Sequence, residues 1–594
     1  MRTKRVQRVF FCLAAVAVLI FLLIGRLAWV QLVMKHQKPP GSTHTLLEVS
    51  MLQRERGLVL DSGRGHFTDR YGVPLTGKLV WAAVLFPSEV GEELPAPRLN
   101  RAAEILKTTP GRLGEVWKGL QKPKLWHAPG SRVPMALDAG QVEAIRALNL
   151  PSLQVLPYEQ RYGEQLSGMQ WLGYVSGQRK ENLFYRDYEG VTGKSGLEKT
   201  LDPLLQGPGP TVVYYPVDSL TRVIRDRQPM VKAPDNPFYP LRFQTTVDVR
   251  IQKGVETLMD QAGVKEGAVV ILDAANGDIV AMASRPFYKP ERISPTEGQW
   301  ENRAVKGAVP GSVFKLITAA AALESGVASP DQLFHCDGAY GKYGLSCWKK
   351  GGHGTLTFRE GFAESCNVVF ASLAEQLSTA ELEEAAYRLG LGRTVGWEAG
   401  HVLGQKLMRP LDLEEKGRIF AETADRLDAG TRVQTAIGQR DVSVSPLQAA
   451  NMIVALLHDG KVPAPRILKS VSYANGQQLQ SFPVMRRSGF AGISPKTARI
   501  LQSWIKNVII RGTGRSLGHR TVWPLAGKSG TAETVVRGQA RNNQWFVGYG
   551  PVENPRYAVA VLVENVRPGS RHAATELFGK TMDLLASAGS AGSK

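Results

Sequence analysis

Cysteine is scarce in this sequence, with four residues in 594: Cys12, Cys336, Cys347 and Cys366. Proteins that depend on a disulfide scaffold contain far more cysteine, so that class is excluded. Internal repeats and long low-complexity tracts are also absent, which excludes a repeat architecture. A chain of this length without repeats predicts two or more folded domains.

Acidic residues are fewer than basic ones. Asp and Glu number 53 against 73 Lys and Arg, so the formal net charge is +20 at pH 7. Such a chain favours an anionic neighbour, for example a nucleic acid, a lipid surface or an acidic polymer. No finger, recognition helix or aromatic ribonucleoprotein pattern is present, and we therefore expect no nucleic-acid partner.

One long apolar segment lies near the N-terminus. Residues 9–33 are mainly apolar and contain one charged residue, Arg26, near the outer end. At about 1.5 Å per residue they suffice to cross a hydrocarbon core of about 30 Å. The basic tail at 1–8 predicts a cytoplasmic N-terminus and an extracytoplasmic bulk. The alternative is a cleaved signal peptide, but the run is too long and no small-residue cleavage site follows it. A single-pass cell-membrane anchor is expected.

The remaining chain divides at a proline-rich stretch near residue 238. After a polar linker at 34–48, residues 49–238 alternate short strands, turns and helices, and none of them is arranged for chemistry. Residues 239–590 begin and end with apolar strand-like runs that enclose helical segments. The predicted fold class is a multidomain α+β or α/β protein, whose second domain has an antiparallel sheet flanked by helices.

The stretch "AVPGSVFKLITAAAALESG" places Ser312 and Lys315 at the start of an apolar helix. Their i, i+3 spacing puts the lysine amine beside the serine hydroxyl. A serine is a poor nucleophile unless a base takes its proton, and a buried lysine with a lowered pKa is such a base. Beginning the helix would also leave the Ser312 backbone N–H unpaired. Taken alone, the pair is more often a capping serine and a surface lysine.

A second cluster, "AESCNVVFASL", sets Ser365 and Asn367 two residues apart, as a hydroxyl and an amide that can face one cleft. A third cluster follows about 163 residues later. Each cluster is weak evidence of catalysis by itself. Ser-x-x-Lys, Ser-x-Asn and Lys-Ser-Gly in this order and at these separations are jointly specific.

The third cluster, "LAGKSGTAETVV", reads as a strand. Alternation along it directs Lys528 and Gly530 to one face and Ser529 and Thr531 to the other, and the glycine lets a substrate backbone approach closely. An earlier Lys-Ser-Gly at 194–196 precedes the candidate nucleophile and lies in a glycine-bounded turn with no strand attached. Order and context therefore favour the later triplet.

The three clusters together resemble the signature of class B penicillin-binding proteins, the peptidoglycan D,D-transpeptidases. The resemblance covers nearly the whole chain. "GRGHFTDRYGVPLTG" is similar to the family's Arg-Gly…Asp-Arg-Asn-Gly segment, with Tyr71 in place of the usual Asn, and "GKSGLEKTLDPLLQG", "AIGQRDVSVSPLQAANM" and "WFVGYGP" follow in family order. It implies an elongated pedestal of dimerisation type at 49–238 and a penicillin-binding transpeptidase domain at 239–590. We expect class B because a glycosyltransferase domain of class A has no room.

The resemblance also implies the chemistry. A serine attacks the carbonyl between the last two D-alanines of a stem pentapeptide, releases D-alanine and leaves an acyl-enzyme, which an amine of a neighbouring stem resolves into a cross-link. It implies no metal and no organic cofactor. The implied roles are Ser312 as nucleophile, Lys315 as base, Ser365 and Lys528 as proton relay, and Asn367 as ligand of the substrate amide. The Ser529 and Thr531 hydroxyls, with Lys528, would receive the terminal carboxylate, and Gly530 would let the substrate backbone approach. The N–H groups of Ser312 and Thr531 would form the oxyanion hole.

Partners follow from the same resemblance: peptidoglycan stem peptides, β-lactams, the membrane bilayer, and a membrane glycosyltransferase or other cell-wall proteins. Three alternatives of the same fold stay open, namely a D,D-carboxypeptidase, a serine β-lactamase, and a non-catalytic β-lactam sensor or division scaffold. The Glu-x-x-Leu-Asn of class A β-lactamases is absent after Ser365. A role in elongation, division or sporulation is not indicated.

Three cysteines lie outside the membrane segment and leave three alternatives open. A redox-sensitive Cys347–Cys366 bridge would pull on the segment that positions Asn367. A structural Cys336–Cys347 bridge is the second possibility, and three buried free thiols are the third. His353, in "KKGGHGTLTF", is expected to have a structural role, because the lysine-based relay leaves it no task as a base.

Overall fold

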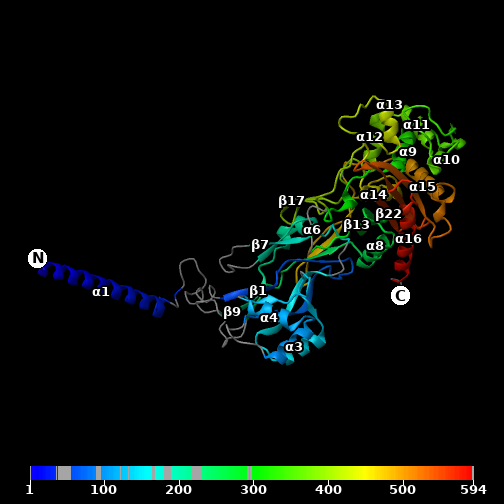
Figure 1. Ribbon diagram of the computed structural model, residues 1–594. Coiled ribbons are helices and arrows are strands. Elements are labelled where there is room, and N and C mark those ends of the chain that lie inside the picture. The colour runs from blue at the N-terminus through cyan, green and yellow to red at the C-terminus, as the bar shows by residue number, and fades with distance from the viewer. Residues whose placement is uncertain are drawn as a thin grey trace.

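The computed structural model describes residues 2–34, 37, 55–87, 95–120, 122–131, 133–163, 168–179, 189–216, 230–290, 293, 298–487 and 489–591. Almost all of the predicted linker at 34–48 lies outside these residues. Figure 1 shows one long helix standing apart from a smaller body, which is followed by a larger one that contains the C-terminal half of the chain.

The long helix is α1 (Arg2–Leu32). Its apolar part, Val6–Val30, has a mean hydropathy of 2.7, and none of it is buried against the rest of the molecule. Twenty-five residues in a helix are long enough to cross a bilayer, and this segment nearly coincides with the predicted 9–33. The protein therefore has an N-terminal helix with the length and composition of a membrane span.

The smaller body contains two sheets. In the first, β9 (Thr211–Pro216) lies between β1 (Glu55–Asp61) and β10 (Met230–Lys232). In the second, β3 (Thr76–Leu85) pairs with β4 (Lys124–Leu125), β5 (Ala136–Leu137) and β6 (Leu153–Tyr162), and the helices α3 (Ala96–Ile105), α4 (Pro110–Lys118) and α5 (Ala139–Ala147) pack against it. Its remaining elements are β7 (Val175–Arg179), β8 (Glu189–Gly193), α6 (Gly196–Thr200) and α7 (Asp202–Leu205).

The two bodies share a four-stranded sheet. Strand β2 (His66–Thr68) pairs in parallel with β11 (Arg242–Thr245), which continues to β18 (Leu468–Ser472) and β19 (Gln478–Ser481). Beside it, the buried guanidinium of Arg64 contacts Glu198 and Asp202, each at 2.7 Å. A buried charge without a partner is very costly, so Arg64 must keep its contacts with both carboxylates. These contacts fix the chain next to the sheet that the two bodies share.

The larger body is built on a five-stranded antiparallel sheet of order β13-β12-β22-β21-β20. The helices α8 (Val249–Gln261) and α16 (Ala573–Ala591) cover one face, and α14 (Pro446–Leu457) covers the other. This confirms the predicted antiparallel sheet flanked by helices. The strands are β12 (Gly267–Asp273), β13 (Ile279–Arg285), β20 (Ala526–Val536), β21 (Gln539–Gly550) and β22 (Tyr557–Val566).

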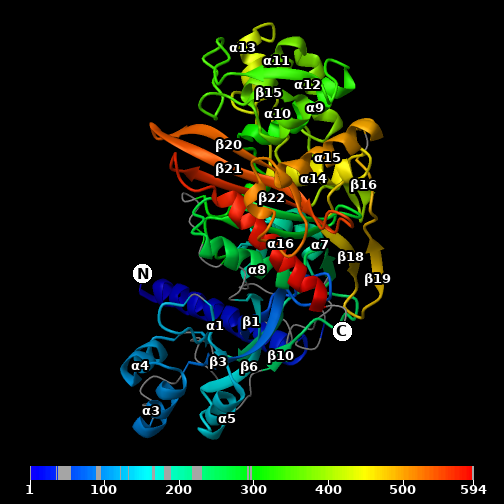
Figure 2. The same cartoon turned by 90° about the vertical axis from the view of Figure 1, so that its right-hand side faces the viewer.

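A mainly helical region lies beyond α14, at the top of Figure 2. Its core helix α9 (Lys315–Glu324) follows the 3₁₀ turn η4 (Gly311–Phe314), and its first eight residues are all buried. Its further elements are α10 (Phe358–Ala363), α11 (Asn367–Gln376), α12 (Thr379–Arg388), α13 (Ala429–Ala436), β14 (Leu333–Cys336) and β15 (Gly354–Thr357). Outside this region lie α15 (Pro495–Ile510), the hairpin of β16 (Ala399–Val402) and β17 (Gln405–Met408), η3 (Arg303–Val305), which packs on the sheet, and η5 (Arg515–Leu517), which packs on α15 and α16.

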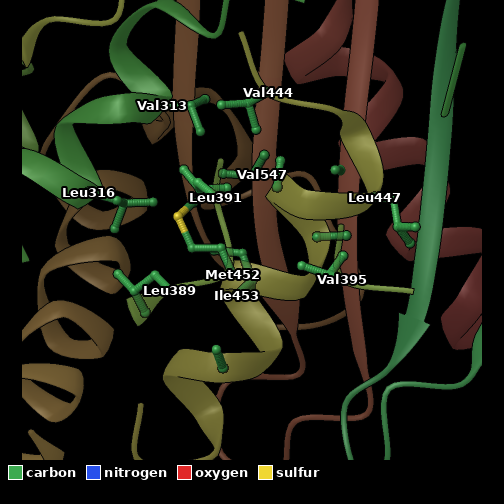
Figure 3. Packing of buried hydrophobic residues seen from close by; sticks show 14 of the residues in the cluster. Val313, Leu316, Leu389, Leu391, Val395, Val444, Leu447, Met452, Ile453 and Val547 are labelled. Carbon is green, nitrogen blue, oxygen red and sulfur yellow. The ribbon is translucent and has the colours of Figure 1, made fainter. Parts of the chain in front are cut away.

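One core joins this helical region to the sheet. Figure 3 shows Val313 and Leu316, from the η4–α9 segment, in the same apolar cluster as Met452 and Ile453 of α14 and Val547 of β21. Burial of apolar side chains contributes about 25 cal/mol per Å². The segment that carries Ser312 is therefore held rigidly against the sheet.

Candidate active site

Ser312 lies in η4, so the prediction that it begins an α-helix is wrong in detail: α9 begins at Lys315. The turn reaches β20 very closely because two glycines have no side chains. A Cβ on Gly311, whose φ is +54°, would lie 2.3 Å from the Thr531 carbonyl oxygen, and a Cβ on Gly530 would lie 2.7 Å from that of Pro310. Such distances are shorter than any real contact, and only glycine permits this approach.

The amine of Lys315 is fully buried beneath the cleft. Nζ donates hydrogen bonds to the Ser365 carbonyl oxygen at 2.8 Å and to Asn367 Oδ1 at 2.7 Å, and it lies 3.3 Å from Ser365 Oγ. Burial lowers the pKa of Lys315 to about 7, against the smaller opposing effect of the nearby Cys366 and Cys347. A neutral amine uses its two N–H groups in the two short bonds and keeps a lone pair to accept a proton.

Ser365 occupies a strained position between two helices. Its φ is +55°, which is uncommon for a residue with a side chain and is typical of functional sites. The amide of Asn367, at the start of α11, donates from Nδ2 to the Ser346 carbonyl oxygen at 3.0 Å, which directs its Oδ1 toward Lys315. The Ser-x-Asn cluster thus holds the lysine from one side.

Lys528 approaches the same serine from the sheet. Its amine is fully buried and donates to Ser365 Oγ at 2.9 Å and to the Ser529 carbonyl oxygen at 3.0 Å. Burial, and next the charge of Lys315, hold the pKa of Lys528 well below its usual range. Ser365 Oγ therefore connects two buried amines, which is the arrangement needed to pass a proton between them.

Strand β20 alternates as predicted. Lys528 and Gly530 are buried, whereas Ser529 is partly exposed and Thr531 is exposed, and both line the cleft. The Ser529 hydroxyl shares a hydrogen bond with Thr513 Oγ1 at 2.8 Å. Sequence reasoning missed Thr513, which follows α15 and belongs to none of the three clusters.

His572 is a second residue that sequence reasoning missed. Nε2 lies 3.1 Å from the Gly530 carbonyl oxygen, and Nδ1 lies 2.7 Å from Thr575 Oγ1. A carbonyl only accepts, so Nε2 carries the proton and Nδ1 accepts from the threonine. Burial, with a smaller effect of Lys528, lowers the pKa of His572 and favours this neutral form. The histidine ties the start of α16 to the strand that carries Lys528.

These groups border a cleft of about 990 Å³. Residues in and next to η5 and the start of α16 also line it and contribute four basic side chains, Arg515, Arg520, Arg571 and Lys580. Lys315 and Lys528 lie beneath the floor. The predicted residues that line the cleft are Ser312, Ser365, Asn367, Ser529, Gly530 and Thr531. The structure therefore brings together all eight predicted site residues.

The earlier Lys-Ser-Gly at 194–196 does not line this cleft, as expected. The prediction that no strand is attached to it is wrong, because β8 ends at Gly193, directly before it. Ser195 is the N-cap residue of α6 and is buried at the junction of the two bodies. We therefore assign Ser195 a structural role and no catalytic one.

The three outer cysteines are free and buried, so neither proposed bridge is present. The Sγ atoms of Cys347 and Cys366 lie 3.9 Å apart, and His353 Nδ1 lies 3.4 Å from Cys347 Sγ and 3.7 Å from Cys336 Sγ. All four ligand atoms lie within 4.8 Å of one another. These are the residues of the cleft region that are able to hold a metal ion.

Taken together, a serine at a closely packed turn, two buried amines joined by a second serine, and a strand edge beside them define a site for acyl transfer to serine. Comparison with known families agrees. Residues 267–583 match the penicillin binding protein transpeptidase domain, and residues 59–235 match the penicillin-binding protein dimerisation domain. The chain belongs to the penicillin-binding proteins that carry these two domains, which confirms the predicted family.

Relatives of known name support the same assignment. Stage V sporulation protein D of Bacillus subtilis (strain 168) is 28% identical over 577 residues, covering 92% of this chain and 80% of the relative. Peptidoglycan D,D-transpeptidase MrdA of Haemophilus influenzae is 26% identical over 586 residues, covering 89% and 84%. A solved chain described under "Structural coordination of polymerization and crosslinking by a peptidoglycan synthase complex" has the same fold, with a TM-score of 0.64, 24% identity and 97% coverage of both chains.

Proposed function

We propose that this protein is a peptidoglycan D,D-transpeptidase that cross-links stem peptides through an acyl-enzyme on Ser312. The observation that carries the proposal is that Ser312 and Ser365 line one cleft, and that the Ser365 hydroxyl lies within hydrogen-bond distance of two buried amines whose pKa values are both lowered. A buried amine whose pKa is lowered becomes neutral more easily and can then accept a proton and pass it on, whereas an exposed lysine stays protonated. The family and the names of its relatives support the same reaction.

In the first step, Ser312 Oγ attacks the carbonyl carbon between the two terminal D-alanines. Lys315 takes the hydroxyl proton, and the tetrahedral oxyanion receives hydrogen bonds from the N–H groups of Ser312 and Thr531, which the close approach of η4 to β20 brings together. The C–N bond then breaks. Lys528 and Ser365 deliver a proton to the departing amine of D-alanine, and the proton on Lys315 restores the relay.

Substrate orientation comes from the exposed face of β20. The hydroxyls of Ser529 and Thr531, with Thr513 beside Ser529, face the cleft and are suited to hold the terminal carboxylate of the substrate. Asn367 lines the cleft on the opposite side and is suited to bind the amide of the stem peptide.

In the second step, an amine of a neighbouring stem attacks the acyl-enzyme and forms the cross-link. Among the described residues, no carboxylate makes a hydrogen bond or ion pair with the side chain of Ser312, Lys315, Ser365 or Lys528. A β-lactamase needs a base that activates water for deacylation, so this observation favours an amine acceptor.

The rest of the chain suits work at a membrane. We propose that α1 anchors the protein with its N-terminus in the cytoplasm, and that residues 49–238 form the pedestal beneath a catalytic domain at 239–590. The basic residues before the apolar run support this orientation. A solved relative belongs to a complex of polymerization and cross-linking, which supports a membrane glycosyltransferase as partner.

The test uses the full-length protein in detergent with lipid-linked pentapeptide precursor and a peptidoglycan glycosyltransferase, followed by mass spectrometry of the digested product. We expect cross-linked dimers and free D-alanine, and neither with Ser312→Ala. Tetrapeptides without dimers would establish the carboxypeptidase instead. Absence of both products, in a preparation that still binds penicillin, would contradict the transpeptidase assignment.

A further inference from the structure

A cluster of four metal-ligand side chains lies directly behind the Ser-x-Asn segment, and the reaction proposed above does not use it. Cys336 ends β14, Cys347 lies in the β14–β15 loop, His353 precedes β15, and Cys366 separates Ser365 from Asn367. Cys336 and Cys366 are completely buried, and Cys347 is nearly so. The fold of the chain brings these four side chains together.

The distances match tetrahedral coordination. With Zn–S bonds of about 2.3 Å and Zn–N bonds of about 2.0–2.1 Å, a tetrahedral ion places two sulfurs about 3.8 Å apart and a sulfur and a nitrogen about 3.6 Å apart. The structure has 3.9 Å for Cys347 Sγ to Cys366 Sγ, and 3.4 and 3.7 Å for His353 Nδ1 to the sulfurs of Cys347 and Cys336. A disulfide would need about 2.05 Å.

The donor set also selects the ion. Three sulfurs and one imidazole nitrogen bind soft or borderline cations and disfavour Mg²⁺ and Ca²⁺, which take oxygen ligands. Four protein ligands with no open position are typical of structural zinc sites. Nδ1 of His353 faces the sulfurs and is the nitrogen that would coordinate the ion, which would leave the ring proton on Nε2.

We propose that Cys336, Cys347, His353 and Cys366 bind one structural Zn²⁺ that fixes the Ser365–Asn367 segment to the β14–β15 loop. Three contacts already join these parts: Asn367 Nδ2 donates to the Ser346 carbonyl oxygen at 3.0 Å, Trp348 Nε1 donates to the Glu364 carbonyl oxygen at 3.0 Å, and Cys366 lies against Cys347. The ion takes no part in the reaction. It holds Ser365 in its uncommon backbone conformation, and it occupies the thiols that a Cys347–Cys366 bridge would consume.

The test is the metal content of full-length protein purified without a metal-affinity tag. We expect about one zinc per chain by elemental mass spectrometry, and a cobalt-exchanged sample with the strong visible absorption of tetrahedral Co²⁺ bound to thiolates. Cys336→Ser removes a ligand remote from the cleft and should lose most of the zinc. Cys12→Ser, in α1, is the matched control and should keep it.

Two results would overturn the proposal. One is wild-type protein that binds less than about a tenth of an equivalent of zinc after zinc is offered under reducing conditions. The other is cobalt-loaded protein without a tetrahedral thiolate spectrum. Because both measurements use the wild type, they remain decisive even if Cys336→Ser does not fold.

A different observation carries a second inference, about Gln439. Its side-chain amide donates from Nε2 to the Thr531 carbonyl oxygen at 3.2 Å and accepts at Oε1 from the Glu533 N–H at 3.1 Å. Strand β20 is the last strand of its sheet, so these backbone groups lie on a free edge. An extended peptide that adds to this edge would use the same two groups.

We infer that Gln439 covers the substrate-binding edge of β20 and must be displaced before a peptide or a β-lactam docks. This inference rests on the proposed function. In stopped-flow acylation with a fluorescent penicillin, Gln439→Ala should lower the dissociation constant of the initial complex about three- to tenfold, with the acylation rate constant unchanged. Arg440→Ala, at the exposed neighbour, is the control and should change neither.

Unchanged or weaker initial binding by Gln439→Ala would overturn the inference, and a slower acylation step would make Gln439 a positioning residue instead. The proposed function is judged separately by Ser312→Ala in the same assay. If that variant is still acylated, the proposed nucleophile is wrong. If it is not, while Gln439→Ala behaves as wild type, only the inference about Gln439 fails.

Discussion

Raising the pH from 6 to 8 should increase the rate of acylation by a β-lactam about tenfold. Burial lowers the pKa of Lys315 to about 7, and only the neutral amine accepts the Ser312 proton. The neutral fraction is then about one tenth at pH 6, one half at pH 7 and nine tenths at pH 8, whereas about one exposed lysine in three thousand is neutral at pH 7. Because the group is needed in its deprotonated form, the rate rises with pH and reaches a plateau above the pKa.

The assay is stopped-flow acylation with a fluorescent penicillin at a series of pH values, with circular dichroism as a check that the fold is unchanged. Lys315→Arg is the matched variant: guanidinium keeps its charge across this range, so acylation should be lost at every pH. A rate independent of pH between 6 and 8, or one that keeps rising toward pH 10, would refute the reasoning that burial prepares this lysine as the base.

Three further variants test other parts of the site. Gly311→Ala should slow acylation about 10²–10³-fold, because its Cβ would push η4 from Thr531 and open the oxyanion hole; normal acylation kinetics would contradict this. Ser365→Ala should cost about 10²–10⁴-fold in the acylation step with initial binding retained, since it removes the link between the two amines; a binding defect alone would contradict the relay. His572→Phe should lower the acylation rate while His572→Gln, which keeps a donor for Gly530, restores part of it; equal rates would remove the tether to β20 from the account.

The elements around the site could be predicted from local pattern. The alternation of β20 predicted Lys528 and Ser529 on opposite faces of the strand, and the continuous apolar runs predicted the central strands of the sheet. The same holds for α1, whose length and composition are those of a membrane span. In each case the information lies within about twenty consecutive residues.

Groups that act through tertiary contact could not be predicted in this way. Thr513 and His572 reach the site because α15 and α16 pack against β20 and its sheet, and neither belongs to a recognisable motif. The 3₁₀ turn η4 was not predicted either, and its close approach to β20 depends on Gly311 and Gly530, which lie far apart in the sequence. Packing between distant segments decides such details.

The cysteines illustrate the same limit. Spacing along the chain left three alternatives open, two different pairwise bridges and three buried free thiols, and the structure has the free, buried thiols. In the folded chain the pairing of β14 with β15 brings Cys336 and His353 next to Cys347 and Cys366. The cluster therefore contains four side chains and not a single pair of cysteines. His353 has the structural environment expected of it, and its proposed partner is a metal ion.

The most direct test of the central claim is peptide mapping of the protein after reaction with a penicillin. The account predicts one long-lived adduct per chain, in the peptide that contains Ser312 and on that residue, because the lactam carbonyl occupies the position of the D-alanyl carbonyl. The adduct should be absent from Ser312→Ala. An adduct on any other residue, or turnover of many equivalents of drug without a stable adduct, would contradict it.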